Sequence, residues 1–150
     1  MLKERLLARE QLLKRGWDVP EIYGDPALLF PKIYNPKIEK KYEYGLIPHC
    51  VDFYSVEGLK AINRAESLGI KIINVTAGIY EFIDQLLECE NILSSSLHGL
   101  IASDSYGIPN YRVKLSSLIH GGDFKYLDYY ASVKRTHHTP LQMNSDIQLK

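Results

Sequence analysis

The chain has 150 residues, close to the usual size of one domain, which predicts one sizeable hydrophobic core. Hydrophobic residues make up 45% and charged residues 24% of it, a composition typical of soluble globular proteins and not of disordered ones. Eighteen basic residues balance eighteen acidic ones, which argues against binding of nucleic acids through an overall positive field.

Cysteine usage and the amino terminus bear on the compartment. Cys50 and Cys89 form no CxxC pair and lie in apolar stretches, so neither a disulfide framework nor a metal site is expected. The pair His137 and His138 has no further ligand type nearby that would make it a metal site. The start, MLKERLLAREQLL, lacks the apolar core of a signal peptide, and no run approaches the roughly 18 apolar residues of a transmembrane segment. The sequence therefore predicts a cytoplasmic protein.

The first expected element is an amphipathic helix. Leucines recur at helical spacing from Leu2 to Leu13, and Gly16 is expected to end the helix because glycine readily adopts the left-handed cap. A short strand is expected at residues 21–24. Asp25 then precedes Pro26 as a helix cap followed by proline at the first helical position, although a contact to substrate is the alternative for Asp25.

Strands and helices then alternate along the chain. The expected strands cover residues 44–50, 70–77, 91–95 and 110–115. The expected helices lie near residues 57–68, 79–89, 97–106 and 124–135. Strict alternation predicts right-handed βαβ crossovers and thus an α/β fold, a Rossmann-like parallel sheet with helices on both faces. Residues 1–135 are expected to form this single domain, and residues 136–150 a tail without periodicity.

Three serines stand where a strand is expected to end and a helix to begin. Ligands of parallel sheets bind outside the carboxyl ends of the strands, so Ser94, Ser95 and Ser96 are expected at the binding edge. A helix start offers N–H groups and a dipole that favour an anion, with His98 in the first turn. The alternative is a cap and turn with a structural His98. Gly99 inside a helix costs about 1 kcal/mol and suggests a close approach of the backbone.

A second histidine follows the first long expected strand. His49 can donate or accept a proton near pH 7, and a carboxylate such as Asp52 can orient it. The alternative is a histidine that is hydrogen-bonded inside its loop. Further along, Tyr126, Tyr129 and Tyr130 recur at helical spacing and are interpreted as core and interface residues, with a platform for a sugar as the alternative.

Four stretches together resemble one enzyme family. YGDPALLFPKIY, GLIPHCVDF, ILSSSLHGLIASDSYGIP and GGDFKYLDYY occur in the order found in the polysaccharide pyruvyl transferase family, over about residues 18–135. The resemblance implies a fold like the two-domain B-type glycosyltransferases, with this chain matching the carboxyl-terminal half. It also implies transfer of pyruvate from phosphoenolpyruvate to two hydroxyls of a sugar, as a ketal, in bacterial-type exopolysaccharide biosynthesis. No cofactor follows from that chemistry, and the implied partners are phosphoenolpyruvate and a saccharide acceptor.

The resemblance also gives the candidate residues their roles. In the family, the stretch equivalent to Ser96, Leu97 and His98 contacts the donor, so His98 is the first candidate for passing a proton and His49 the second, nearer the sugar. The substrate-binding candidates are Ser94, Ser95, Ser96, Leu97, Gly99, Asp25 and Arg9. The family often has an arginine where Ser96 stands, and only Leu7, Arg9 and Glu10 match its leading motif.

Three functions stay open at this point. In the first, the chain is the donor-binding half of a pyruvyl transferase, active only with its missing amino-terminal half or a partner. In the second, it is a truncated, non-catalytic remnant or interaction module. In the third, it is half of a nucleotide-sugar glycosyltransferase. The serine in place of arginine and the incomplete leading motif favour the second function. The third stays open because a fold alone does not choose the chemistry. An exposed face that the missing half would cover also makes a homo-oligomer an expectation.

Overall fold

The computed structural model describes residues 7–119, 122–136 and 139–143, which divide into two units. Residues 26–119 and 140–143 belong to the larger unit, and residues 7–25, 122–136 and 139 to the smaller. His137 and His138 lie outside the described residues. The expectation of one domain over residues 1–135 stays a prediction.

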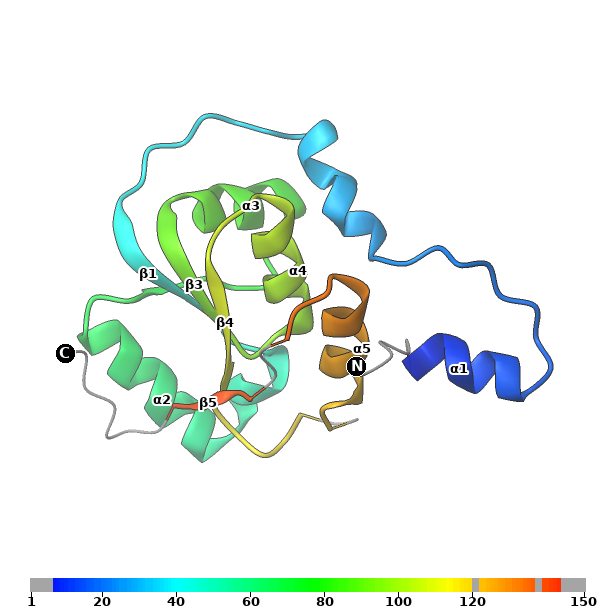
Figure 1. Cartoon of the computed structure of the whole chain (residues 1–150). Coiled ribbons are helices and arrows are strands. Elements are labelled where there is room, and N and C mark those ends of the chain that lie inside the picture. Colours follow the sequence, from blue (N-terminus) through cyan, green and yellow to red (C-terminus); the bar gives the residue numbers. More distant parts are fainter. Residues whose placement is uncertain (1–6, 120–121, 137–138, 144–150) are drawn as a thin grey trace. The chain divides into compact units, whose positions relative to one another are not determined.

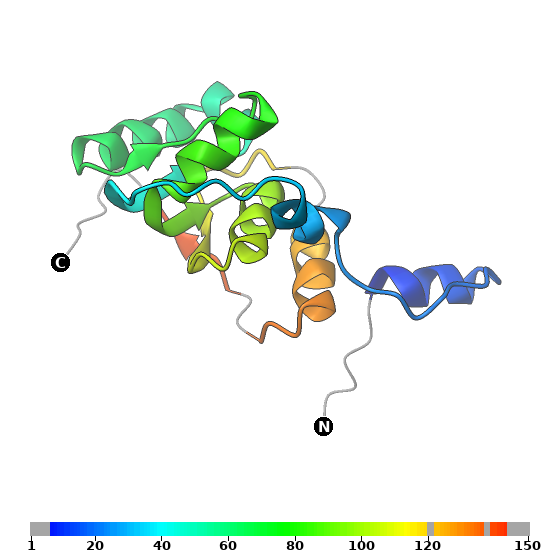
Figure 2. The same ribbon diagram turned by 90° about the horizontal axis from the view of Figure 1, so that it is seen from above.

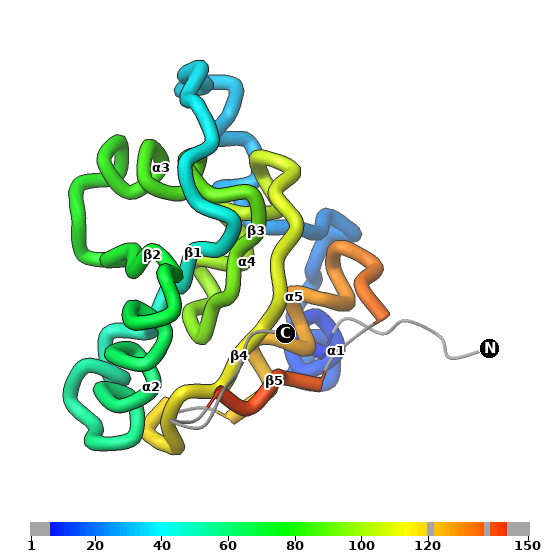
Figure 3. The backbone as a smooth tube through the Cα atoms, turned by 90° about the vertical axis from the view of Figure 1, so that its left-hand side faces the viewer, coloured from blue at the N-terminus to red at the C-terminus, as the bar shows by residue number. Residues whose placement is uncertain are grey.

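The larger unit is built on a parallel sheet of five strands in the order β2-β1-β3-β4-β5. The strands are β1 (Tyr42–Ile47), β2 (Lys71–Ile72), β3 (Cys89–Ser94), β4 (Asn110–Lys114) and β5 (Leu141–Gln142). Every neighbouring pair is parallel, and the longest pairing joins β1 to β3, from Tyr42 opposite Cys89 to Ile47 opposite Ser94. β1 and β3 lie side by side in Figure 3.

Helices cover both faces of this sheet. They are α2 (Val56–Ser67), α3 (Ile79–Leu87) and α4 (Leu97–Ser105), with short 3-10 helices η1 (Pro26–Lys32) and η2 (Cys50–Tyr54). Leu46 packs in one core cluster with Ala61 of α2, whereas the next residue, Ile47, packs in another with Ile83 of α3. Successive strand residues point to opposite faces, so α2 lies on one face and α3 and α4 on the other (Figures 1 and 2). The predicted Rossmann-like α/β fold is confirmed.

The differences from the expected elements have local causes. Residues 21–24 form no strand, so that prediction is wrong: Ile22 is 83% exposed and gains no burial that would stabilise pairing. The strand expected at 70–77 ends early because Asn74 accepts hydrogen bonds from Thr76 and turns the chain. Within the expected tail, Leu141–Gln142 form the edge strand β5, and the next residue, Met143, is buried in the core.

The smaller unit contains α1 (Leu7–Lys14) and α5 (Phe124–Ser132). The amide of Ala8 donates to Asp128 Oδ1 at 2.8 Å and so joins the two helices. Gly16 has φ +81°, the left-handed conformation predicted for the end of the first helix. The three tyrosines of α5 are buried, as their interpretation as core residues predicted. In the described part of the chain, no helix is long and apolar enough to cross a membrane.

Candidate active site at the carboxyl edge of the sheet

The sheet has one place where its connections diverge. After β1 the chain passes through α2 to β2, and after β3 it passes through α4 to β4 on the other side of β1. Because α2 and α4 cover opposite faces, the loops that follow β1 and β3 run apart at the carboxyl edge. Open α/β sheets bind their ligands at such a switch point. The two loops carry His49 and residues 94–98, which the sequence singled out independently.

His49 forms the amino-terminal cap of η2. Its Nδ1 accepts a hydrogen bond from the Val51 amide at 3.3 Å, and its own amide lies 3.1 Å from Asp52 Oδ2. The His49 ring is therefore hydrogen-bonded inside its loop, which is the alternative that the sequence analysis gave for this histidine. With Nδ1 as the acceptor, a neutral imidazole carries its proton on Nε2. The sequence suggested that Asp52 orients the His49 ring. In these bonds Asp52 contacts the backbone amide of His49 and not its ring.

Asp52 instead joins three loops through a fully buried carboxylate. Ser95, after β3, donates its hydroxyl to Asp52 Oδ2 at 2.6 Å, and Ser116, after β4, donates to Oδ1 at 2.5 Å. The amide of His49, after β1, lies within hydrogen-bonding distance of both Asp52 Oδ2 and Ser95 Oγ. A buried carboxylate requires donors of this kind. These bonds fix the ends of the three loops relative to one another.

The three serines, Ser94 to Ser96, mostly serve the fold. Ser94 Oγ lies 3.0 Å from the Ile47 carbonyl and accepts the Ser96 amide at 3.0 Å, which holds the ends of β1 and β3 together. Ser94 and Ser95 are fully buried, and Ser96 is 3% exposed. Ser96 is the amino-terminal cap residue of α4 but makes no side-chain capping bond. The first-turn amides of residues 97–99 therefore remain as the groups of this motif that suit an anion.

Gly99 allows α4 to pack directly on the strand ends. A Cβ atom at this position would lie 2.3 Å from Ser94 Oγ and 2.9 Å from Ile47 Cγ2, both far inside normal contact distance. A glycine within a helix predicted a close approach of the backbone, and this prediction is confirmed for α4 at Gly99. The hydroxyl of Ser103 donates to the Gly99 carbonyl at 2.7 Å and bonds the next turn of α4 to the same residue.

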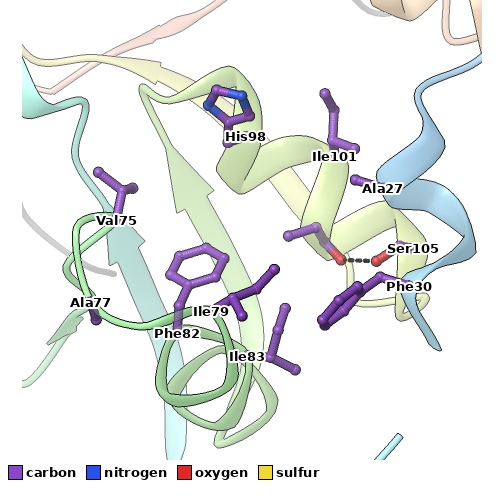
Figure 4. Close-up of a pocket in the computed structure, with 11 residues that line it drawn as sticks. Ala27, Phe30, Val75, Ala77, Ile79, Phe82, Ile83, His98, Ile101 and Ser105 are labelled. Carbon is purple, nitrogen blue, oxygen red and sulfur yellow. Dashed lines mark hydrogen bonds between the residues drawn. The ribbon is translucent and has the colours of Figure 1, made fainter. Parts of the chain in front are cut away.

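His98 is exposed in the first turn of α4 and lines a pocket of about 370 Å³. The pocket is bounded by η1, the segment between β2 and α3, α3 itself and α4 (Figure 4). The sequence did not reveal this pocket, because its apolar residues come from four separate segments and each is equally typical of ordinary core. Leu97, the neighbour of His98, is half-buried.

Two expected substrate contacts belong to the smaller unit. Arg9 donates from Nε to the Val19 carbonyl at 3.2 Å and lies 3.4 Å from the carboxylate of Glu21, so its guanidinium takes part in local contacts. Asp25 directly precedes Pro26, which begins η1 as predicted. A role for Arg9 and Asp25 in binding substrate stays a prediction. Within the described ranges, no group of three or more His, Cys, Asp or Glu residues is arranged to hold a metal ion.

Comparisons with known proteins agree with the resemblance read from the sequence. A family model described as polysaccharide pyruvyl transferase matches residues 6–117. An uncharacterized protein of Acanthamoeba polyphaga mimivirus is 33% identical to this chain over 109 residues. That match covers 71% of this chain but only 38% of the viral protein, so the chain spans well under half the length of this relative. No solved structure matches the chain, and its likeness to the B-type glycosyltransferases therefore stays a prediction.

Proposed function

The chain belongs to the polysaccharide pyruvyl transferase family, and from this premise we propose that it is the donor-binding half of such an enzyme. The proposed reaction transfers pyruvate from phosphoenolpyruvate to two hydroxyls of a saccharide, as a ketal. The observation that carries the proposal is the position of the His49 loop and the start of α4 on either side of the switch point of the sheet.

The reaction needs three events at the donor. Its methylene carbon takes up a proton, the resulting cationic carbon is captured by a sugar hydroxyl, which loses its proton, and phosphate departs before the second hydroxyl closes the ketal. We assign the proton on the methylene carbon to His98, and the phosphate to the amides of residues 97–99. His49, in the loop after β1, is the second candidate for a contact with a ligand oxygen.

The proposal includes a second half that binds the saccharide across the crevice. It is supported by the coverage of the viral relative, of which the chain matches 38%. Holding donor and acceptor together contributes a large part of the rate of such a transfer. The described residues alone are therefore expected to bind the donor without turning it over.

A second candidate function is a non-catalytic binding module with the same fold. One observation favours it: the hydroxyls of Ser94 and Ser95 are already bonded within the fold, and Ser96 offers no guanidinium where the family often has one. In that case His98 is an exposed side chain without a ligand.

An NMR titration separates the two functions. With phosphoenolpyruvate at millimolar concentration, the amides of residues 97–99 are expected to shift, and His98→Ala to weaken binding by about 1–3 kcal/mol, the contribution of a charge-assisted hydrogen bond. Asn63→Ala, an exposed change on α2, serves as the control and is expected to leave the affinity unchanged. Ser96→Arg is expected to tighten binding by restoring a bidentate donor.

Two other outcomes would replace the proposal. Amides that do not move at millimolar phosphoenolpyruvate would leave the non-catalytic module as the function. If a nucleotide sugar shifts the amide signals of residues 97–99 and phosphoenolpyruvate does not, the glycosyltransferase alternative would replace the proposal.

A further inference from the structure

The pocket beside His98 has almost no polar groups. Nine of its eleven lining residues are apolar, and the other two are His98 and Ser105. Figure 4 shows Phe82 and Ile83 on the side of α3, with Phe30 of η1 and Ile101 of α4 across the space from them. The Ser105 hydroxyl donates its single proton to the Ala102 carbonyl at 2.7 Å. Among the lining side chains, His98 is thus left to donate a hydrogen bond to a ligand.

The walls of the pocket are held in place by bonds outside it. Tyr34, two residues after η1, donates its hydroxyl to Asp84 of α3 at 2.7 Å, which raises the pKa of Tyr34. Tyr106, directly after α4, donates its hydroxyl to the Tyr34 carbonyl. Phe30 lies 6.5 Å from the Tyr34 ring and 6.4 Å from the Tyr80 ring, between ring centroids. The pocket is therefore preformed and does not depend on a ligand to assemble it.

This lining selects against the polar parts of both proposed substrates. Phosphoenolpyruvate carries a phosphate and a carboxylate, and a bare hexose carries hydroxyls around its whole ring. A buried hydroxyl without a partner costs about 1–3 kcal/mol, and an unpaired charge costs more. Carbon-lined space suits a group that needs no hydrogen bonds. A cavity of about 150 Å³ accepts benzene, so about 370 Å³ has room for roughly two fused rings.

We infer that this pocket binds an apolar ring group attached to the saccharide acceptor, with the polar linkage beside His98. The inference rests on the proposed function for the identity of the acceptor, whereas the ring site itself rests on the lining, volume and anchoring of the pocket. It makes the acceptor a glycoside with an apolar ring substituent and not a bare sugar. The side chains of α3, α4 and η1 then determine acceptor specificity.

A matched pair of ligands tests the inference. 2-Naphthyl β-D-glucopyranoside carries the ring group, and methyl β-D-glucopyranoside has the same sugar without it. With labelled isoleucine methyl groups, the naphthyl ligand is expected to shift Ile79, Ile83 and Ile101, which line the pocket. Ile62 and Ile70, in the core cluster on the opposite face of the sheet, are expected to stay unmoved. The naphthyl ligand should bind at least ~10-fold more tightly than the methyl ligand.

A blocking variant sharpens the test. Ala102→Phe fills the pocket and is expected to abolish the ~10-fold preference, while Glu66→Phe, an exposed change on α2, retains it. Equal affinity for the two ligands would overturn the inference, and so would shifts of Ile62 and Ile70 as large as those in the pocket. These outcomes need only the wild-type chain, so they hold even if Ala102→Phe does not fold. Donor binding is read from the amides of residues 97–99, so its failure is seen separately from failure of the ring site.

Discussion

At the carboxyl end of β1 and β3, the fully buried carboxylate of Asp52 accepts hydrogen bonds from donors in three loops. At the amino end, the partly exposed carboxylate of Glu88 lies near two lysines instead. Lys41 lies 2.6 Å and Lys71 3.8 Å from Glu88, and the Lys41 side chain is 57% exposed. Both ends hold the same pair of strands. They do so by opposite means: buried hydrogen bonds at one end and solvent-screened charge at the other.

The difference shows which end of the sheet tolerates change. Exposed ion pairs contribute little, because water and salt screen them. Removing the hydrogen-bond donors around a buried carboxylate lowers stability, and removing the carboxylate leaves those donors buried without an acceptor. The Glu88 ion pairs at the amino end are therefore expected to tolerate substitution, and the groups bonded to Asp52 at the carboxyl end are expected to lose stability when they are replaced. The candidate active site lies at this less tolerant end.

The largest expected effect is that of Asp52→Ala. It leaves the Ser95 and Ser116 hydroxyls buried without their acceptor and removes one of the two acceptors near the His49 amide, so the free energy of unfolding should fall by about 3–5 kcal/mol. Asp52→Asn retains one acceptor oxygen and should lose less. Urea denaturation followed by circular dichroism measures both. A loss for Asp52→Ala no larger than that for Glu88→Ala would contradict the contrast between the two ends.

The next effect is that of Gly99→Ala at the same edge. Its Cβ would lie 2.3 Å from Ser94 Oγ, so α4 or β3 must shift, and a loss of about 1–3 kcal/mol is expected from overpacking. Gly78→Ala is the matched control: Gly78 also stands at a helix start, but a Cβ there meets nothing within 4 Å. Combining Gly99→Ala with Ser94→Ala should recover part of the loss in the same denaturation measurement. Full tolerance of Gly99→Ala alone would rule out close packing at this position.

The chemical reactivity of the two cysteines gives another comparison of the carboxyl and amino ends of the sheet. Cys50, at the carboxyl end, is exposed, with its Sγ 3.6 Å from His49 Nδ1, whereas Cys89 begins β3 at the amino end and is buried. Burial raises the pKa of Cys89 to about 11, so at pH 8 only about a thousandth of it is thiolate. Iodoacetamide at pH 8, followed by mass spectrometry, should label Cys50 and leave Cys89 unmodified until urea is added. Equal labelling of both thiols in the folded chain would contradict the burial of Cys89.

The smallest expected effect is that of Lys41→Ala at the amino end. The hydrogen bond and charge of Lys41 lower the pKa of Glu88 below its usual value near 4.5. A carboxyl group with a lowered pKa stabilises the fold above its ordinary pKa, and the stabilisation disappears as the pH falls through the lowered value. Lys41→Ala should therefore cause a slight fall in melting temperature at pH 7, and none at low pH or in high salt. A fall as large as that of Gly99→Ala would show that this exposed pair is more than a surface contact.

The alternation of apolar and helical segments was sufficient to predict β1, β3, β4 and the helices between them, because each is long enough to show its period. The two-residue strand β5 was missed because two residues have no period. Residues 21–24 looked like a strand by composition, but a strand also needs a partner and a buried face, which a local stretch does not reveal.

The candidate site was predictable in place but not in detail. The order of strand and helix was enough to put His98 and the three serines at the carboxyl edge. The direction of the serine hydroxyls was not predictable, because Ser95 and Ser116 meet Asp52 across 43 and 64 residues of sequence. Contacts of that range depend on the register of the strands, which no local spacing encodes. The apolar pocket was missed for the same reason.

The shared carboxylate of Asp52 also has a consequence for motion. Three loops that hydrogen-bond to one buried group cannot open one at a time without leaving a buried polar atom unpaired. They should therefore open together, and amide hydrogen exchange at the ends of β1, β3 and β4 should share one opening free energy. A ligand that restrains the start of α4 would then slow exchange in the other two loops without touching them. The edge of the sheet would behave as one cooperative element, and its rigidity would be set by a residue that never meets solvent.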